Sequence, residues 1–587
     1  MKQLAYFLLS LPLVFAGCVN KTRPVLNCET YAEGINPDTT DRSLEWGEVE
    51  NFTVSFGSVN HRYAKGEVPD IKPEKSWQGS GWKGETISAQ IVMWSPKPIE
   101  QIECEFTQFK SANGDIMDAS IANARFVRYV LTDVFQNGCG YRKPEDFPSS
   151  LSADGLDNIA CFSISENTAR PVWISLNIPR DAKPGIYAGK VNIYARNKKT
   201  NTLDISIEVL PQTLPEVKDW KFHLDLWQHP TAVARTGNVE LWSEEHWKLI
   251  ESTMAILASA GQKVITATLN KDPWNNQCYD GYADMIKWTK KQNGFWEYDY
   301  TVFDRWVSLM MNLGIKGYIN CYSMLPWNSE LHYYDEKENK MINISAPPKS
   351  KEFAELWTPF LKNFRLHLES KGWLKITNIA IDERAPEDVD ITLSLLEKVA
   401  PELGVSFADN HKSYKQYPTL RDVCASYGNL FDAADLEFRK NKGLISTYYV
   451  CCSDKFPNVF TFSEPAEATY IAWHAVAAGY DGFLRWAYNS WTENPLIDSR
   501  FRTWPAGDTY IVYPGARSSI RFERLKEGIQ DAEKIWILKA KFESEGNQEK
   551  LEILNNTLAA FAAPGIPEIP TGVMINRAKK ILEALSR

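Results

Sequence analysis

Two kinds of hydrophobic pattern divide this chain of 587 residues. Residues 26–215 contain short runs in which apolar and polar positions alternate, such as RFVRYVLT and GIYAGKVNIYA, separated by Pro, Gly and Asn. Alternation with a period of two is typical of strands with one buried face, and turn signals at regular spacing favour two packed sheets. The sequence therefore predicts an N-terminal β-sandwich domain over residues 19–215.

From about residue 220, short apolar strands alternate with longer amphipathic runs such as SEEHWKLIESTMAILASAG, which have apolar residues at helical spacing. Strand and helix in alternation predict a parallel sheet, and this length favours a (β/α)8 barrel over residues 216–540. A closed barrel needs an eighth strand. We assign it to the region 432–443, or else to a segment that the pattern does not identify as a strand. The seven predicted strands are 221–227, 263–269, 316–323, 376–383, 404–410, 443–450 and 482–488.

The last residues, 541–587, predict helices around a Pro-rich break. A single hydrophobic core stops growing at roughly 250–300 residues, so a chain of this length should form more than one domain. The predicted fold class is therefore multidomain: a β-sandwich, a (β/α)8 TIM-type barrel and C-terminal helices.

Residues 1–18, MKQLAYFLLSLPLVFAGC, have the features of a secretory signal: an early Lys, an apolar stretch and small residues before a cysteine. The ending FAGC resembles a bacterial lipobox, which predicts lipidation of Cys18 and an exported protein anchored to a bacterial membrane, facing the periplasm or the cell surface. The alternative is a soluble secreted protein in which Cys18 is either discarded or incidental. No later segment has some 18 consecutive apolar residues, so a lipid would be the only membrane attachment.

Charge and cysteine content narrow the possible partners. A net charge of -9 offers no broad basic field for a phosphate backbone, so we expect no nucleic-acid partner. The chain has 10 cysteines, an odd number of them after Cys18, without CxxC spacing. We expect no metal and no other cofactor, and the sequence leaves any disulfide pairing open.

Polar and aromatic residues follow the predicted barrel strands, at WQHP, NKDPW, SMLPW, DERAPED, ADNHK, YYVCC and RWAYNSW. Catalytic groups of such barrels lie at the C-terminal strand ends, and acids, amides and aromatic rings suit a sugar-binding cleft. Asp382 and Glu383 stand side by side where the fourth strand ends. Neighbouring residues on a strand face opposite sides, so the pair could serve one ligand only where the pleat breaks down. The simpler interpretation is a pair of solvated surface charges.

Three segments together resemble glycoside hydrolase family 123, the β-N-acetylgalactosaminidases: IAIDE, YDGFLRWAYNSW and SSIRFERLKEGIQDAEKIWIL. The resemblance covers nearly the whole mature chain, and the RFERLKEGIQDAE segment supports the fold more than the substrate. It implies an N-terminal sandwich, a (β/α)8 domain and an exo-acting, retaining mechanism in which the 2-acetamido group of the sugar is the nucleophile. Glu383 would be the general acid and base, and Asp382 would orient the acetamido group. The implied partner is a glycan with terminal β-linked N-acetylgalactosamine.

Further residues at the strand ends are candidates for binding the sugar. Tyr448 or Tyr449 could donate a hydrogen bond to the acetamido oxygen, and Trp486 could form a platform under the ring, unless these are core aromatics. Arg384 could neutralise the pair from outside the site. The candidates for binding hydroxyl groups, which could equally be loop caps, are His229, Asn270, Asp409 and Asn410.

Two other functions remain open at this level. One is a hydrolase of another sugar that uses a separate nucleophile, such as Asp409, on a different strand. The other is a lipid-anchored glycan-binding protein without activity. The presence of both Asp382 and Glu383 argues against the second.

Overall fold

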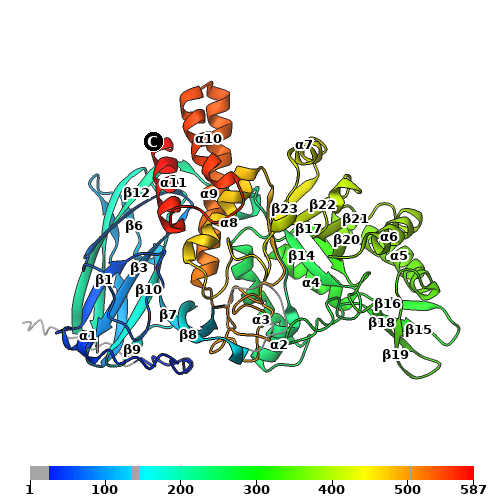
Figure 1. Cartoon of the computed structure of the whole chain (residues 1–587), viewed down its shortest axis with the longest axis horizontal. Helices are drawn as coiled ribbons and strands as arrows, with labels where there is room; N and C mark the ends of the chain where they lie inside the picture. Colours follow the sequence, from blue (N-terminus) through cyan, green and yellow to red (C-terminus); the bar gives the residue numbers. More distant parts are fainter. Residues whose placement is uncertain (1–25, 135–143, 197, 503) are drawn as a thin grey trace, which may run out of the picture.

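The computed structural model describes residues 26–134, 144–196, 198–502 and 504–587. The predicted signal peptide and Cys18 lie outside these residues. Within the described ranges, no helix has the length and apolar character needed to cross a membrane. Figure 1 shows a sheet-rich N-terminal domain on the left, a barrel on the right, and the helices α8 to α11 between and above them.

The N-terminal domain is a β-sandwich, as predicted. One sheet has five strands in the order β1-β3-β10-β7-β8, and the other has seven, with β2-β12-β11-β4-β9 as its main path and β5 and β6 at its side. Ile91 and Val172 of the first sheet share one buried apolar core with Val191 and Ile205 of the second. The strands are β1 (Thr53–Gly57), β2 (Ser76–Lys83), β3 (Thr86–Ser95), β4 (Ile99–Phe106), β5 (Phe109–Ser111), β6 (Ile116–Met117), β7 (Ala122–Asp133), β8 (Ser149–Asp157), β9 (Phe162–Ile164), β10 (Thr168–Asn177), β11 (Gly185–Ala195) and β12 (Lys198–Thr213), with one short helix, α1 (Ser43–Gly47).

The second domain is built on eight parallel strands in the order β13-β24-β23-β22-β21-β20-β17-β14. The two ends of this order approach one another: the Lys263 backbone N–H donates to the Leu224 carbonyl at 2.9 Å, so the barrel is nearly closed. The strands are β13 (His223–Leu226), β14 (Val264–Thr268), β17 (Tyr318–Tyr322), β20 (Thr377–Asp382), β21 (Gly404–Asp409), β22 (Asp422–Ser426), β23 (Ile445–Tyr449) and β24 (Gly482–Arg485).

All seven predicted barrel strands are confirmed, but the assignment of the eighth to 432–443 is wrong. That region forms the helix α7 (Ala433–Asn441), and the eighth strand is β22. The connection from β21 to β22 contains only a short 3-10 turn, Ser413–Lys415, so the strand–helix alternation is interrupted there. A five-residue strand without a helix before it gave no alternating signal.

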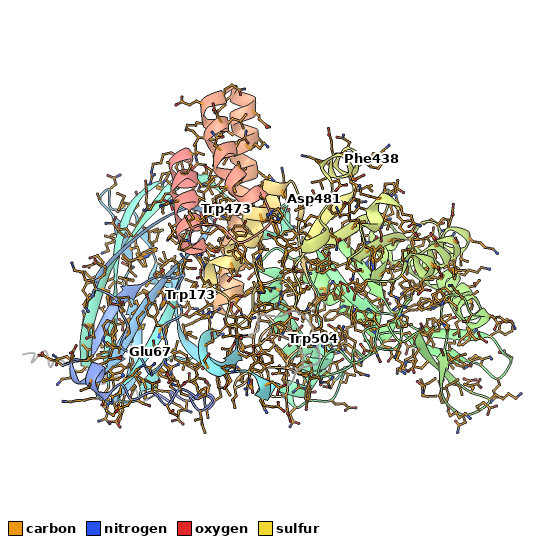
Figure 2. The ribbon with its side chains drawn as sticks, in the orientation of Figure 1. Glu67, Trp173, Phe438, Trp473, Asp481 and Trp504 are labelled. Carbon is orange, nitrogen blue, oxygen red and sulfur yellow. A yellow bond between two sulfur atoms is a disulfide. The ribbon has the colours of Figure 1, made fainter. Side chains whose placement is uncertain are left out.

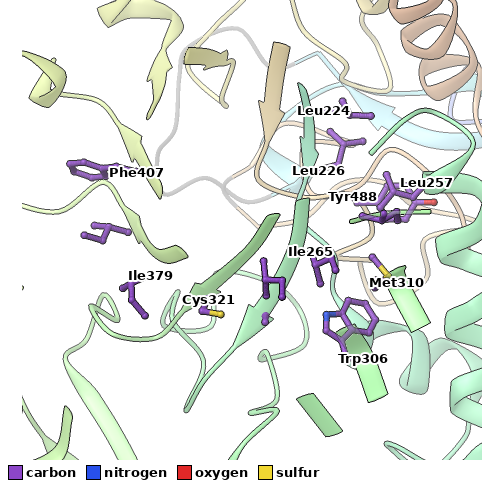
Figure 3. Packing of buried hydrophobic residues seen from close by; sticks show 14 of the residues in the cluster. Leu224, Leu226, Leu257, Ile265, Trp306, Met310, Cys321, Ile379, Phe407 and Tyr488 are labelled. Carbon is purple, nitrogen blue, oxygen red and sulfur yellow. The ribbon is translucent and has the colours of Figure 1, made fainter. Parts of the chain in front are cut away.

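Side chains alternate between the two sides of the barrel wall. Outward-facing residues such as Ile265, Cys321, Ile379 and Phe407 pack in the apolar layer beneath the helices (Figure 3). The helices of this domain are α2 (Pro230–Gly237), α3 (Glu244–Ala258), α4 (Thr301–Asn312), α5 (Lys351–Lys371), α6 (Pro386–Val399), α7, α8 (Pro465–Ala478) and α9 (Ile520–Glu545), followed by α10 (Gln548–Ala562) and α11 (Thr571–Leu585).

Polar residues alternate with this apolar layer on the barrel strands. Asn378 donates to the Asn320 side chain at 2.8 Å, and Asn320 donates to Ser406 at 3.0 Å, which links three neighbouring strands inside the barrel. Asp382 is two inward positions beyond Asn378 on β20, because inward residues recur every second position. The barrel therefore points Asp382 toward its C-terminal mouth.

The RFERLKEGIQDAE segment lies at the start of α9 and joins the two domains. The Arg521 side chain donates to Asp154 of the sandwich at 2.9 Å and to the carbonyls of Val459, Gly507 and Tyr510. A Cβ added at Gly528 would lie 2.7 Å from the Thr469 carbonyl of α8, so only glycine permits this close helix contact. The motif therefore stabilises the packing of the two domains.

Two features were not predicted from the sequence. The loops after β14 and β17 form a small sheet in the order β16-β15-β18-β19, seen at the lower right of Figure 1. Its strands are β15 (Lys287–Lys290), β16 (Trp296–Asp299), β18 (Glu330–Asp335) and β19 (Lys340–Ser345). A disulfide between Cys28 and Cys161 ties the start of the described chain to the sandwich.

Candidate active site

The adjacent carboxylates Asp382 and Glu383 face the same space because the strand geometry changes between them. β20 ends at Asp382, and Glu383 has a φ of 47°, in the left-handed region. The Glu383 backbone N–H still donates to the Ala408 carbonyl at 2.9 Å, so this residue remains attached to β21. A regular strand would have sent Glu383 outward. The backbone turn instead brings both carboxyl groups into one pocket.

This pocket lies at the C-terminal mouth of the barrel and has a volume of about 240 Å³. Five of its thirteen lining residues are aromatic, and its charged groups are the carboxylate pair and Asp508. The lining residues are Trp227, Gln277, Trp327, Asp382, Glu383, Ala408, Tyr449, Cys451, Cys452, Leu484, Trp486, Trp504 and Asp508. Aromatic rings with a few converging polar groups are typical of a site that binds a sugar.

Asp382 is surrounded by groups that act on its charge in opposite directions. Burial, followed by the charge of Glu383, raises the pKa of Asp382 to about 8, while the indole groups of Trp274 and Trp327 and the Arg384 guanidinium act to lower it. The Trp274 Nε1–H donates to Asp382 Oδ2 at 2.8 Å. Arg384 itself is held by Asp388 at 3.4 Å, at the edge of the site. Near neutral pH, Asp382 therefore retains its proton.

Glu383 accepts a hydrogen bond from the hydroxyl of Tyr449, at the end of β23. Burial, followed by the negative charge of Glu383, raises the pKa of Tyr449, so the phenol stays protonated and remains a donor. Tyr448 faces the other way, and its hydroxyl donates to the Ile471 carbonyl of α8 at 2.8 Å. Of the two tyrosines considered from the sequence, the structure therefore places Tyr449 in the pocket.

Trp486 forms a wall of the pocket, together with Trp504. The Trp486 Nε1–H donates to Asp508 Oδ2 at 3.2 Å, and the buried Arg485 guanidinium donates to Asp508 Oδ1 at 2.8 Å. The Trp504 ring, labelled in Figure 2, meets Trp486 edge-on with 5.8 Å between ring centroids. Asp508 therefore orients this wall through both of its carboxylate oxygens.

The four residues considered for binding hydroxyl groups do not line the pocket. His229 is buried, stacks on Tyr282 with centroids 3.7 Å apart, and its Nδ1 lies 3.0 Å from Ser490 Oγ. Asn270 pairs with the backbone of His332 in β18 at 2.9 Å.

Asp409 and Asn410 likewise hold the loop after β21. Asp409 accepts hydrogen bonds from the backbone of His411 at 3.0 Å and from the Ser413 hydroxyl at 2.9 Å. The Asn410 carbonyl accepts from the Asn429 side chain at 2.9 Å. These contacts are typical of turn-stabilising Asp and Asn residues.

Several residues of the site were not predicted individually from the sequence: Trp227, Trp274, Gln277, Trp327, Trp504 and Asp508. A usable signal existed for three of the tryptophans, because each stands at a strand end or in the loop that follows it. Trp504 and Asp508 lie far beyond β24, in a long loop whose path the sequence pattern does not reveal. Among the described residues, no cluster of three or more His, Cys, Asp or Glu residues could hold a metal ion.

Comparison with known proteins gives a consistent result for both domains. The model of the glycoside hydrolase 123 catalytic domain matches residues 227–538, and that of the glycoside hydrolase 123 N-terminal domain matches residues 56–195. A solved structure of a family 123 glycoside hydrolase from Clostridium perfringens, described for glycolipid glycan hydrolysis, is similar with a TM-score of 0.81 and 28% identity. The alignment covers 91% of this chain and 97% of that chain.

Two other solved structures are far less similar. A Bacteroides ovatus GH5 xyloglucanase has a TM-score of 0.29 at 9% identity, with 81% of this chain and 100% of that chain covered. A Thermotoga neapolitana maltogenic α-amylase has a TM-score of 0.31 at 11% identity, with 53% of this chain and 76% of that chain covered. Comparison with curated protein sequences finds no match. Since the catalytic-domain model alone spans more than half of the sequence, the chain belongs to glycoside hydrolase family 123.

Proposed function

We propose that this chain is an exo-acting, retaining β-N-acetylgalactosaminidase that uses the 2-acetamido group of its substrate as the nucleophile. The observation that carries the proposal is the positive φ of Glu383, which brings two sequence neighbours into one pocket. Adjacent carboxyl groups can contact neighbouring atoms of one sugar. An enzyme nucleophile would instead need a carboxyl group about 5–5.5 Å from the acid, across the scissile bond.

Glu383 would first act as the general acid. As the acetamido oxygen attacks the anomeric carbon, the bond to the leaving oxygen breaks, and that oxygen takes the Glu383 proton. In the second step, the Glu383 carboxylate removes a proton from water, which attacks the same carbon and reopens the oxazoline-type intermediate. The single O–H of Tyr449, which donates to Glu383 in the free site, would turn to the acetamido oxygen when the sugar binds.

Asp382 would accept the acetamido N–H and offset the positive charge that develops on that group. In the free site, burial and Glu383 favour a proton on Asp382. An N–H donor from the substrate stabilises the ionised form of Asp382. Binding would therefore favour transfer of the shared proton to Glu383, where the leaving group requires it.

The small volume of the pocket supports attack at a chain end. Its volume of about 240 Å³ lies below the roughly 300–1,000 Å³ of pockets that hold drug-sized ligands. This size suits one terminal sugar.

The similar Clostridium perfringens enzyme is described for glycolipid glycan hydrolysis. We propose a glycan with terminal N-acetylgalactosamine as substrate, and an exported protein held at a bacterial membrane by a lipid on Cys18.

The structure offers little support for a separate nucleophile. Asp409 does not line the pocket, and its oxygens are taken by His411 and Ser413. Asp508 does line it, but its two oxygens are engaged by Arg485 and Trp486.

Substrate preference can be tested with residues 19–587 and 4-nitrophenyl glycosides. We expect hydrolysis of the β-N-acetylgalactosaminide, slower hydrolysis of the β-N-acetylglucosaminide, and at least about 10³-fold lower kcat/KM for the β-galactoside, because that sugar lacks the internal nucleophile. Equal rates on the galactoside would contradict the proposed mechanism. Preference for the glucosaminide would leave the mechanism standing and overturn the proposed sugar.

A further inference from the structure

We propose that Trp274 is a positioning residue for Asp382: its indole N–H fixes one carboxylate oxygen, so that the other is presented to the acetamido N–H. This inference rests on the proposed function, in which Asp382 receives that group. Trp274 Nε1 lies 2.8 Å from Asp382 Oδ2, and Trp274 does not line the pocket. It would therefore act through Asp382 and not through contact with the sugar.

The indole ring of Trp274 is held from several sides. Only 2% of this residue is exposed. Its ring stacks on Trp227 at 5.0 Å between centroids and meets Tyr322 at 4.9 Å and Tyr282 at 4.6 Å. Tyr282 in turn stacks on His229. The packed rings thus fix the direction of the N–H. The Trp274 side chain therefore loses little conformational entropy when a substrate binds.

The backbone of the loop that carries Trp274 is also fixed. Asp272 accepts hydrogen bonds from the backbone of Asn276 at 2.7 Å and Tyr282 at 3.4 Å. These bonds fold the loop after β14 around one carboxylate. The loop that carries the donor to Asp382 is therefore held in one conformation by its own hydrogen bonds.

Few charged groups besides Glu383 and Arg384 influence the ionisation of Asp382. Glu383 raises the pKa of Asp382, and Arg384 lowers it. From the neighbouring strands, Asp382 faces three further titratable groups, Tyr322, Cys424 and Tyr449, and burial raises the pKa of each, so they stay neutral at ordinary pH. The indole donors are therefore among the few groups that favour the ionised form of Asp382.

The variant Trp274→Phe tests this role, with Trp288→Phe as the matched control. The control removes a buried indole N–H that donates to the Leu269 carbonyl at 3.1 Å, away from the carboxylate pair. With Trp274→Phe, Asp382 loses a donor and binds its proton more tightly. We expect the basic limb of the kcat/KM profile, where Asp382 gives up its proton, to move to higher pH by about one unit and the plateau to fall about tenfold, with no such shift in the control.

An unshifted basic limb in Trp274→Phe, whatever the fall in the plateau, would overturn the proposal and leave the proposed function intact. Full activity of the Asp382→Asn variant would instead contradict the proposed function itself. If Trp274→Phe does not fold, benzothienylalanine at position 274 keeps the shape of the ring and lacks only the N–H. The same upward shift is expected with it, and an unchanged profile would equally contradict the role of Trp274.

Discussion

Replacement of Glu383 by Gln should lower kcat/KM on aryl β-N-acetylgalactosaminides by about 10²–10⁴-fold, because the site loses its only proposed proton donor and acceptor. The loss should be larger for a poor leaving group such as 4-methoxyphenol than for 2,4-dinitrophenol, which departs without protonation. Steady-state rates over a series of phenols measure this dependence. The amide oxygen introduced by Glu383→Gln can still accept a hydrogen bond from Tyr449, so the variant should fold like the native chain.

Asp409→Asn is a fitting control for Glu383→Gln, since Asp409 also ends a barrel strand but lies outside the pocket. We expect its kcat/KM to stay within about tenfold of the native value, although stability should fall, because Asn cannot accept all the hydrogen bonds that Asp409 receives. A loss in a folded Asp409→Asn variant as large as that in Glu383→Gln would support a separate nucleophile.

Replacement of Asp382 by Asn should affect activity and stability in opposite directions. Without the carboxylate, the acetamido group is neither oriented nor electrostatically stabilised, and we expect kcat to fall about 10²–10³-fold. Burial of Asp382 next to Glu383 also strains the native chain, so the neutral amide should raise the melting temperature at pH 8. Groups that an active site needs for activity commonly lower the stability of the folded protein.

The pH dependence of this stabilisation follows from the raised pKa. In the unfolded chain, Asp382 releases its proton near its ordinary value of 3.8, whereas the native group retains it up to about pH 8. Between these values the native state binds more protons, so the contribution of Asp382 to stability falls as the pH rises. The advantage of Asp382→Asn should be absent near pH 4 and grow toward pH 8, where it is on the order of a few kcal/mol. Calorimetry at both pH values measures it, and a constant difference would contradict this account.

The barrel could be predicted because its strands and helices carry their own periodic patterns. The pattern failed at β22, where a short turn replaces the expected helix. The alternation of side chains along each strand also separates residues that face the pocket from residues that face the helices. Phe407 faces the helices, so Asp409, two positions on, faces outward as well, and the same rule separates Tyr448 from Tyr449.

The carboxylate pair could be located from its place after a strand, but the sequence did not show how both groups reach one pocket. That depends on a positive φ at Glu383, a conformation that non-glycine residues rarely adopt and that no side-chain pattern announces. Trp504 and Asp508 were equally hidden, because their loop is shaped by distant contacts such as that of Arg521 with the Gly507 and Tyr510 carbonyls.

The central claim is that the acetamido group of the substrate is the nucleophile. The most direct test compares kcat/KM for 4-nitrophenyl β-galactosaminides whose N-acetyl group carries zero, one, two or three fluorine atoms. Each fluorine withdraws electrons from the carbonyl oxygen and weakens it as a nucleophile. We predict a steep, progressive decrease across the series in the native protein. Rates that do not depend on fluorination would contradict the account and indicate a nucleophile supplied by the protein.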